Sequence, residues 1–188
     1  MASSIGGPWA ALAPLLVAGA TLADTGFQFA APNVNAPPDP NVKGVRLSFL
    51  HGKNQSVRGL DFGLLSLSET SRASGVAFIA GVHHVKEAMT NGATFSLVNY
   101  HTGRDSGVNG AFVNVLNDTS EAFNVGFITY AEGATGVDLG GINISRSSKA
   151  QIGFLNMTDR IESFQFGFLN IADNGFLPIF PVFNFAKD

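Results

Sequence analysis

The stretches KAQIGFLN (149–156) and SFQFGFLN (163–170) decide the fold that this sequence predicts. Both carry Gln, Gly, Phe, Leu and Asn at the same places, and both are eight residues long. Related copies occur along the preceding chain: GVRLSFLH (44–51), GLDFGLLS (59–66), GVAFIAGV (75–82), GATFSLVN (92–99), GAFVNVLN (110–117), AFNVGFIT (122–129) and GVDLGGIN (136–143). Such self-similarity predicts a stack of similar units.

The eight positions of the copies form columns, numbered one to eight, that differ in chemistry. Columns two, four and six are almost entirely apolar, and column five is mostly Gly or Ser. Column three is mostly polar or charged, with Arg46, Asp61, Thr94, Asn124, Asp138, Gln151 and Gln165. Apolar residues at every second position are typical of a strand with one buried face. We therefore expect columns two, four and six to face the core, and column three to face solvent.

Two all-β architectures accept this repeat. In a β-solenoid of about nine short coils, equivalent strands stack about 4.8 Å apart and the closing Asn residues form a ladder at one corner. In an antiparallel β-meander or a small outer-membrane-type β-barrel, alternate strands run in opposite directions, and a barrel would also accept an apolar outward face. The connections show no alternation of short and long, which favours the solenoid.

The chain before the repeats divides into two segments. Residues 1–23 contain no Lys, Arg, Asp or Glu and include the small-residue motif Ala18-Gly19-Ala20. These features predict a signal peptide, with a short apolar anchor as the alternative. Residues 24–42 are rich in Pro and Asn, and we expect them to form a linker, because proline cannot donate to a strand ladder.

The repeats and the end of the chain form two further segments. Residues 43–173 are expected to be a nine-copy β-repeat domain. Residues 174–188 depart from the repeat and are strongly apolar, with Pro178 and Pro181. Because the last coil of a solenoid has an unpaired edge, this segment is expected to be a C-terminal cap.

Composition excludes several classes of function. The 188 residues suit one domain, and 11 Lys and Arg against 14 Asp and Glu give a net charge of −3, which argues against a nucleic-acid partner. The absence of cysteine excludes disulfides and a cysteine nucleophile. No G-x-S-x-G, H-E-x-x-H or phosphate-loop motif occurs.

The remaining chemical candidates are histidines and two carboxylates. His51, His83, His84 and His101 lack metal-ligand spacing, and we expect His83 and His84 to be a solvated pair. Asp61 and Asp138 share column three but stand five copies apart, too far for paired carboxylate catalysis. We therefore expect no catalytic, cofactor-binding or metal-binding residues, no cofactor and no enzymatic activity.

The copies resemble a bacterial exported surface-repeat family with GLQIGLxN-type repeats and an apolar two-proline C-terminal segment. The match is carried by KAQIGFLN, SFQFGFLN and the closing FLPIFPVFNF (176–185), and it covers about residues 43–188. The resemblance implies an exported bacterial protein of undefined biochemical role. It transfers no catalytic residue, because the family motif is a structural repeat.

These observations predict a non-enzymatic exported or surface-associated repeat protein that acts as a structural or binding scaffold; a small outer-membrane β-barrel is the alternative. The expected location is the periplasm, the outer membrane or the cell surface. The recognition edge is expected in the longer connections at 51–58, 66–74, 82–91 and 99–109. A cell-envelope component, a host or surface ligand, the membrane and a second copy bound through the C-terminal apolar segment stay open as partners.

Overall fold

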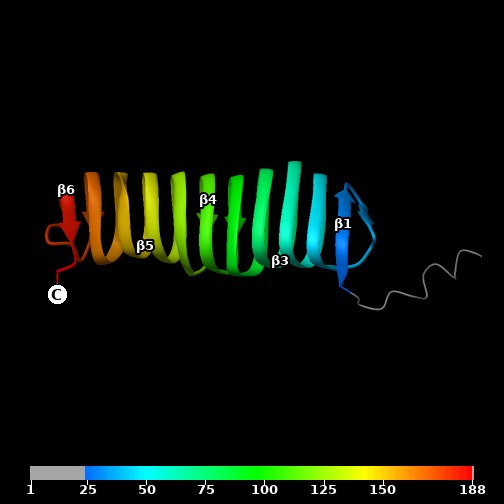
Figure 1. Ribbon diagram of the computed structural model, residues 1–188. Coiled ribbons are helices and arrows are strands. Elements are labelled where there is room, and N and C mark those ends of the chain that lie inside the picture. Colours follow the sequence, from blue (N-terminus) through cyan, green and yellow to red (C-terminus); the bar gives the residue numbers. More distant parts are fainter. Residues whose placement is uncertain (1–23, 188) are drawn as a thin grey trace, which may run out of the picture.

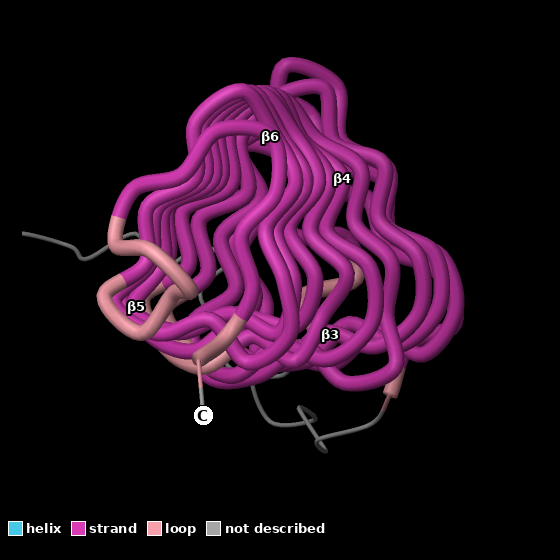
Figure 2. Tube along the Cα trace, turned by 90° about the vertical axis from the view of Figure 1, so that its left-hand side faces the viewer, coloured by secondary structure: helices cyan, strands magenta, loops and turns pink. Residues whose placement is uncertain are grey.

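Residues 24–187 are described by a computed structural model, and nearly all of them lie in β-strands (Figure 1). The elements are β1 (Thr25–Ala31), β2 (Val34–Ala36), β3 (Asn41–His101), β4 (Arg104–Leu116), β5 (Ser120–Ala172) and β6 (Ile179–Phe185). They form one sheet in the order β2-β1-β3-β4-β5-β6. β3 and β5 are long because each winds through several coils without a break (Figure 2). The expected signal peptide lies outside the described residues.

The coils pair in parallel, which confirms the β-solenoid. β1 pairs with β3, β3 with β4, and β4 with β5, all in parallel. The register keeps equivalent residues in line, so that Thr94 pairs with Asn109 and Asn109 with Asn124. This parallel pairing decides against the antiparallel alternatives.

The register of the fifth copy differs from the sequence alignment. Gly107 pairs with Gly92, and Asn114 pairs with Asn99. The copy is therefore GVNGAFVN (107–114), and the alignment on 110–117 is wrong. The backbone requires a glycine at this start, because Gly107 has a φ of 126° and an added Cβ would lie 1.9 Å from the Gly92 carbonyl oxygen.

The first strand lies in the segment that was expected to be a linker. Phe27 pairs with Val45 and Gln28 with Arg46, so that β1 continues the column pattern of the later copies. The amide of Gln28 also donates hydrogen bonds to the carbonyl oxygens of Pro37 (3.0 Å) and Asp39 (2.8 Å). The expectation that 24–42 stays outside the ladder is therefore wrong for β1.

The interior beside the repeat strands is mainly polar, and the apolar columns face outward; buried apolar residues outside the copies, such as Met89, Leu116 and Ile161, complete the core. Phe166 in column four is 51% exposed and Phe168 in column six is 69% exposed, whereas Gln165 in column three is fully buried. The same holds along the stack, where the buried polar residues of this column include Gln28, Arg46, Asp61, Thr94, Asn109, Asn124, Asp138 and Gln151. The expectation that columns two, four and six face the core, with column three in solvent, is therefore wrong for columns three, four and six. Column two is mixed, because Leu60 and Phe123 are exposed whereas Ala150 is buried.

Space inside the coil explains this inversion. Column five points inward and is small because the closing Asn of a copy crosses beside it. An added Cβ on Gly153 would lie 2.6 Å from Asn143 Nδ2 and 2.5 Å from the Gly140 carbonyl oxygen. An added Cβ on Gly167 would lie 2.6 Å from Asn156 Nδ2. An interior this narrow does not accept phenylalanine rings.

Polar side chains fill the interior because they satisfy one another from coil to coil. Asn143 Nδ2 donates to Asn156 Oδ1 at 2.8 Å, and Asn156 Nδ2 donates to Asn170 Oδ1 at 2.8 Å. These bonds form part of the expected Asn ladder, and buried amides in such ladders keep their hydrogen bonds. A second ladder runs through column three, from Asn109 to Asn124 at 2.9 Å.

Antiparallel strands occupy both ends of the stack. β2 pairs with the outer edge of β1, and β6 pairs with the last coil through Phe166 with Phe183 and Gln165 with Asn184. These strands use the hydrogen-bonding groups that a further coil would need. The proline-containing C-terminal segment thus lies where the sequence places a cap.

Candidate functional site: an exposed apolar face

Columns four and six form two outward rows that run along the solenoid axis, and together we call them the apolar face. Their large exposed members are Leu47, Phe49, Phe62, Leu64, Phe78, Phe95, Leu97, Phe112, Phe127, Phe154, Phe166 and Phe168. Across the copies from 44 to 170, no charged residue stands in either column. A contiguous apolar surface of this extent is typical of an interaction site.

The rings of the apolar face are stacked. Phe78 lies between Phe62 and Phe95, with ring centroids 5.6 Å and 5.3 Å away and nearly parallel planes. Phe112 stacks on Phe127 at 5.3 Å. These distances follow the spacing of the coils, about 4.8 Å. Because stacking holds each ring in place, the face is ordered before any partner arrives.

Glycines end two of the stacks. An added Cβ on Gly110 would lie 2.9 Å from Cδ1 of Phe95, and one on Gly141 would lie 3.2 Å from the ring of Phe127. Each ring thus lies over the glycine of the next coil.

A hollow lies between the two rows in the N-terminal part of the face. It has a volume of about 450 Å³ and is lined by Phe29, Leu47, Ser48, Phe49, Phe62, Gly63, Leu64 and Phe78. The volume is within the range of ligand pockets, and the lining is almost wholly apolar. The hollow can accept aliphatic or aromatic groups but offers few polar contacts for orienting a ligand.

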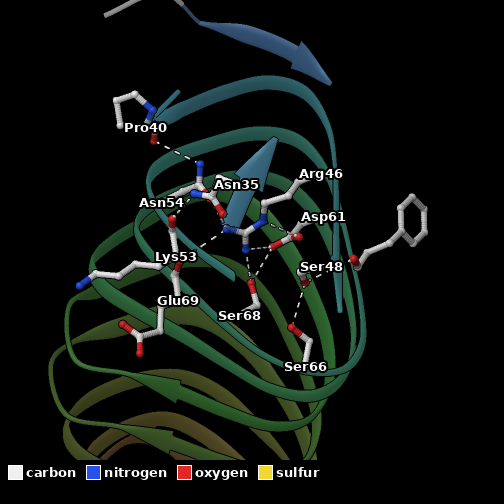
Figure 3. A network of polar contacts seen from close by, with 11 residues as sticks. Asn35, Pro40, Arg46, Ser48, Lys53, Asn54, Asp61, Ser66, Ser68 and Glu69 are labelled. Carbon is white, nitrogen blue, oxygen red and sulfur yellow. Dashed lines mark hydrogen bonds and ion pairs between the residues drawn. The ribbon is translucent and has the colours of Figure 1, made fainter. Parts of the chain in front are cut away.

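Two charged residues of column three, Arg46 and Asp61, lie in one polar network inside the coil (Figure 3). Arg46 Nε donates to Asp61 Oδ1 at 2.9 Å, and Arg46 Nη1 donates to Asn54 Oδ1 at 2.9 Å. Ser68 bonds with both Arg46 and Asp61. Asp61 is therefore a structural residue, because its carboxylate is buried and paired with a cation.

Asp138 is held in a separate network and does not meet Asp61. Its carboxylate accepts hydrogen bonds from Asn124 (2.9 Å), Thr135 (2.6 Å) and Ser148 (3.1 Å). Burial raises the pKa of Asp138 above its ordinary value, and these hydrogen bonds partly oppose that shift. The two acidic residues of column three thus make no catalytic pair.

The histidines are more buried than the sequence suggested. His83 and His101 lie inside the coil, with ring centroids 5.5 Å apart, and His101 Nδ1 lies 2.6 Å from Asp105 Oδ2. Burial, helped by nearby His101, lowers the pKa of His83 to about 3. The expectation of a solvated His83 and His84 pair is therefore wrong for His83. Within residues 24–187, no three His, Asp or Glu side chains are arranged to hold a metal ion.

Sequence reasoning found the residues of the apolar face but assigned them to the core. The signal that could have placed them outside is the small column five beside a closing Asn, since Gly153 leaves an inward space that an amide fills. Three of the longer connections expected to form a recognition edge, 51–58, 66–74 and 82–91, are continuous parts of β3 and are therefore strands, not loops. The outward apolar columns are the more distinctive surface.

In comparisons with known proteins, no family model, no curated protein and no solved structure matches this chain. Among the described residues, no helix is long and apolar enough to cross a membrane.

Proposed function

We propose that this chain is a non-enzymatic exported scaffold that binds its partner through the apolar face. The observation that carries the proposal is the double row of exposed, mutually stacked phenylalanines, such as Phe78 and Phe95, on a rigid solenoid. Water contact with so much ordered apolar surface is unfavourable, and removing it from water contributes roughly 25 cal/mol per Å² of apolar area against the entropy lost on association.

The absence of enzymatic activity is proposed from where the reactive side chains lie. Asp61, Asp138, His83 and His101 are all buried in the interior and engaged with protein groups or packed against them. A substrate approaching the apolar face would meet hydrocarbon and backbone. A binding or structural role suits this surface better than acid–base or nucleophilic chemistry.

Export is proposed from the uncharged residues 1–23, the small-residue motif at 18–20 and the resemblance to bacterial surface-repeat proteins. The periplasm, the outer membrane and the cell surface are the corresponding locations. The lack of cysteine suits any of them and also makes the chain convenient for labelling.

Single-cysteine labelling in intact producing cells tests both parts of the proposal. Leu97→Cys places a thiol on the apolar face, where Leu97 is 60% exposed, and Glu132→Cys places one at an exposed position outside columns four and six. The reagent is a small charged maleimide that enters the periplasm and does not cross the cytoplasmic membrane. We expect rapid labelling of Glu132→Cys and protection of Leu97→Cys until the protein is denatured.

Two results would contradict the proposal. If Glu132→Cys reacts only after the cytoplasmic membrane is broken, the chain is not exported. If Leu97→Cys reacts as fast as Glu132→Cys in intact cells, nothing covers the apolar face, and its role as a binding surface fails.

A further inference from the structure

We infer that the occupant of the apolar face is a second copy of this chain, packed face to face with its solenoid axis antiparallel to the first. This inference rests on the binding role proposed for the face and names the partner. It makes the two outward sheets the inner layers of an intermolecular sandwich.

The size of the face suits a stable dimer. The interface would take in the whole outward side of the strands from column one to column seven, including the exposed column-two residues Leu60 and Phe123 beside the apolar face. At roughly 3.3 Å per residue this side is about 23 Å wide, and about 40 Å of stacked coils give it an area of roughly 900 Å² per chain. Two such faces would bury about 1,800 Å², which is within the range of specific protein interfaces, about 1,200–2,000 Å². A flat rigid surface of this length needs a partner that is equally long and flat, and a second solenoid provides one.

The surface shape of the face also suits a second copy. Two outward rows with a hollow between them can interlock with the same two rows of a partner, as the inner faces of β-sandwiches do at a separation of about 10 Å. Small residues also stand next to large ones in both rows, Gly110 beside Phe95 and Gly141 beside Phe127. The rows are therefore uneven, as side chains that interdigitate with a partner's rows require.

Charge selects the antiparallel arrangement. Residues 24–106 carry seven Lys and Arg against six Asp and Glu, whereas residues 107–187 carry four against seven. Along the rim that precedes column one, exposed Lys43 and Arg58 lie in the first half, and exposed Glu121 and Glu162 lie in the second. Asp24 and Lys149 depart from this trend. An antiparallel pair places the positive half of each chain over the negative half of its partner.

The same charges favour a second copy over a lipid surface. Interfacial protein segments that bind anionic membranes carry Lys and Arg beside their apolar face. The C-terminal half of this stack has an acidic excess, so an anionic bilayer would repel it. A protein partner with the reversed gradient is attracted along the whole length.

Sedimentation equilibrium of the purified protein tests the dimer. We expect twice the mass of the 19.7 kDa chain, and a Phe112→Lys variant that is monomeric, with affinity reduced at least about 100-fold because a desolvated ammonium would be buried in the apolar interface. Leu97→Lys should act in the same way. Gln55→Lys adds the same charge at an exposed position outside the face and should remain dimeric. Far-ultraviolet circular dichroism should be unchanged in all three variants.

Thiol crosslinking tests the orientation, because the chain has no cysteine of its own. Phe49 and Phe168 stand in column six of the first and the last copy, and an antiparallel pair brings Phe49 of one chain over Phe168 of the other. The two faces lie about 10 Å apart, beyond the reach of a disulfide, so the reagent is a bismaleimide of about that length. Mixing Phe49→Cys chains with Phe168→Cys chains should yield crosslinked dimers, and either variant treated alone should yield few.

The outcomes separate this inference from the proposed function. A folded monomer, together with protection of Leu97→Cys in cells, would overturn the dimer and leave the face as the binding site of another partner. A monomer that co-sediments with phosphatidylcholine–phosphatidylglycerol vesicles would assign the face to lipid. Crosslinking of Phe49→Cys alone, without mixed dimers, would overturn the antiparallel orientation.

Discussion

Gly153 illustrates how a missing side chain organises a coil. It stands in column five, and the space beside it is filled by the amides of Asn143 and Asn156, which lie within 3.0 Å of where its Cβ would be. The Gly and the Asn of the GFLN ending therefore depend on each other. The glycine provides the room, and the asparagine provides the hydrogen bonds that connect successive coils.

A methyl group at this position should be poorly tolerated. We expect Gly153→Ala to lower the free energy of unfolding by about 2 kcal/mol or more, because the added Cβ meets backbone and amide atoms at 2.5–2.6 Å. Gly26→Ala is the matched control, since its Cβ would meet nothing within 4 Å. Urea unfolding measures both changes, and equal shifts in the two midpoints would contradict the account of column five.

His83 should make stability depend on pH. The pKa of His83 is about 3 in the folded chain, against an ordinary value of 6.5. Between these two pH values the unfolded chain therefore binds a proton at His83 that the folded chain does not bind. This contribution to stability is complete above pH 6.5 and is lost as pH falls toward 3, at no more than about 1.4 kcal/mol per pH unit. His101, Asp61, Arg46 and His84 are the charged or titratable groups that surround it.

The measurement compares the native chain with His83→Gln at pH 7 and pH 5. We expect the native chain to lose about 2 kcal/mol more than the variant over this interval, as linkage predicts for that difference in pKa. The raised pKa of Asp138 acts in the opposite direction, since its charged form becomes costly as pH rises above 3.8. It is common to both proteins, so the difference between them isolates His83. Parallel pH profiles would show that His83 is protonated in the folded chain.

The strand β6 protects the last coil by using its hydrogen-bonding edge. It pairs antiparallel with Phe164–Ile171, and Pro181 within it lacks the N–H group that a further strand would require. At the C-terminal end of the stack, one edge of β6 is therefore paired with the last coil, and its other edge lacks the N–H donor of Pro181. The apolar character of this segment reflects its position at the end of the outward rows.

Removal of β6 should convert the end of the stack into a template for growth. A chain that stops at Ala172 is expected to form larger, concentration-dependent assemblies, because the exposed edge of the last coil can pair with other chains. Light scattering and electron microscopy measure their size. Val182→Ser keeps the strand while altering an exposed side chain, so it serves as the control. Unchanged assembly size after truncation would show that β6 has no protective role.

Considered as a whole, the molecule reverses the usual distribution of polar and apolar groups. Its interior is held by ladders such as Thr94 to Asn109 at 3.2 Å and Asn109 to Asn124 at 2.9 Å, which cross from coil to coil. Its largest apolar side chains, including Phe154 and Phe168, stack on the outside at 4.9 Å. Hydrogen bonds between polar side chains thus contribute to stability inside the coil, and a large apolar surface is exposed outside it.

The local pattern was enough to predict a repeat and an all-β chain, and it favoured a parallel stack with an Asn ladder over the antiparallel alternatives. The ladder follows from spacing along the chain, since a closing residue such as Asn156 returns at nearly the same interval and, once the coils stack in parallel, aligns with Asn170. The alternation of two residues likewise showed that the two faces of each strand differ. It could not show which face lies inside.

That choice depends on contacts between residues far apart in sequence. Whether Phe166 or Gln165 points inward is settled by the width of the coil, by the space that Gly153 leaves and by the partners that Gln151 and Asn184 offer across coils. Long-range pairing also sets the register of the fifth copy at Gly107 and places β1 in the sheet. The closed coil buries His83. A periodic sequence specifies which residues share a side; only the closed coil, through its limited volume and its hydrogen bonds, makes one side the core.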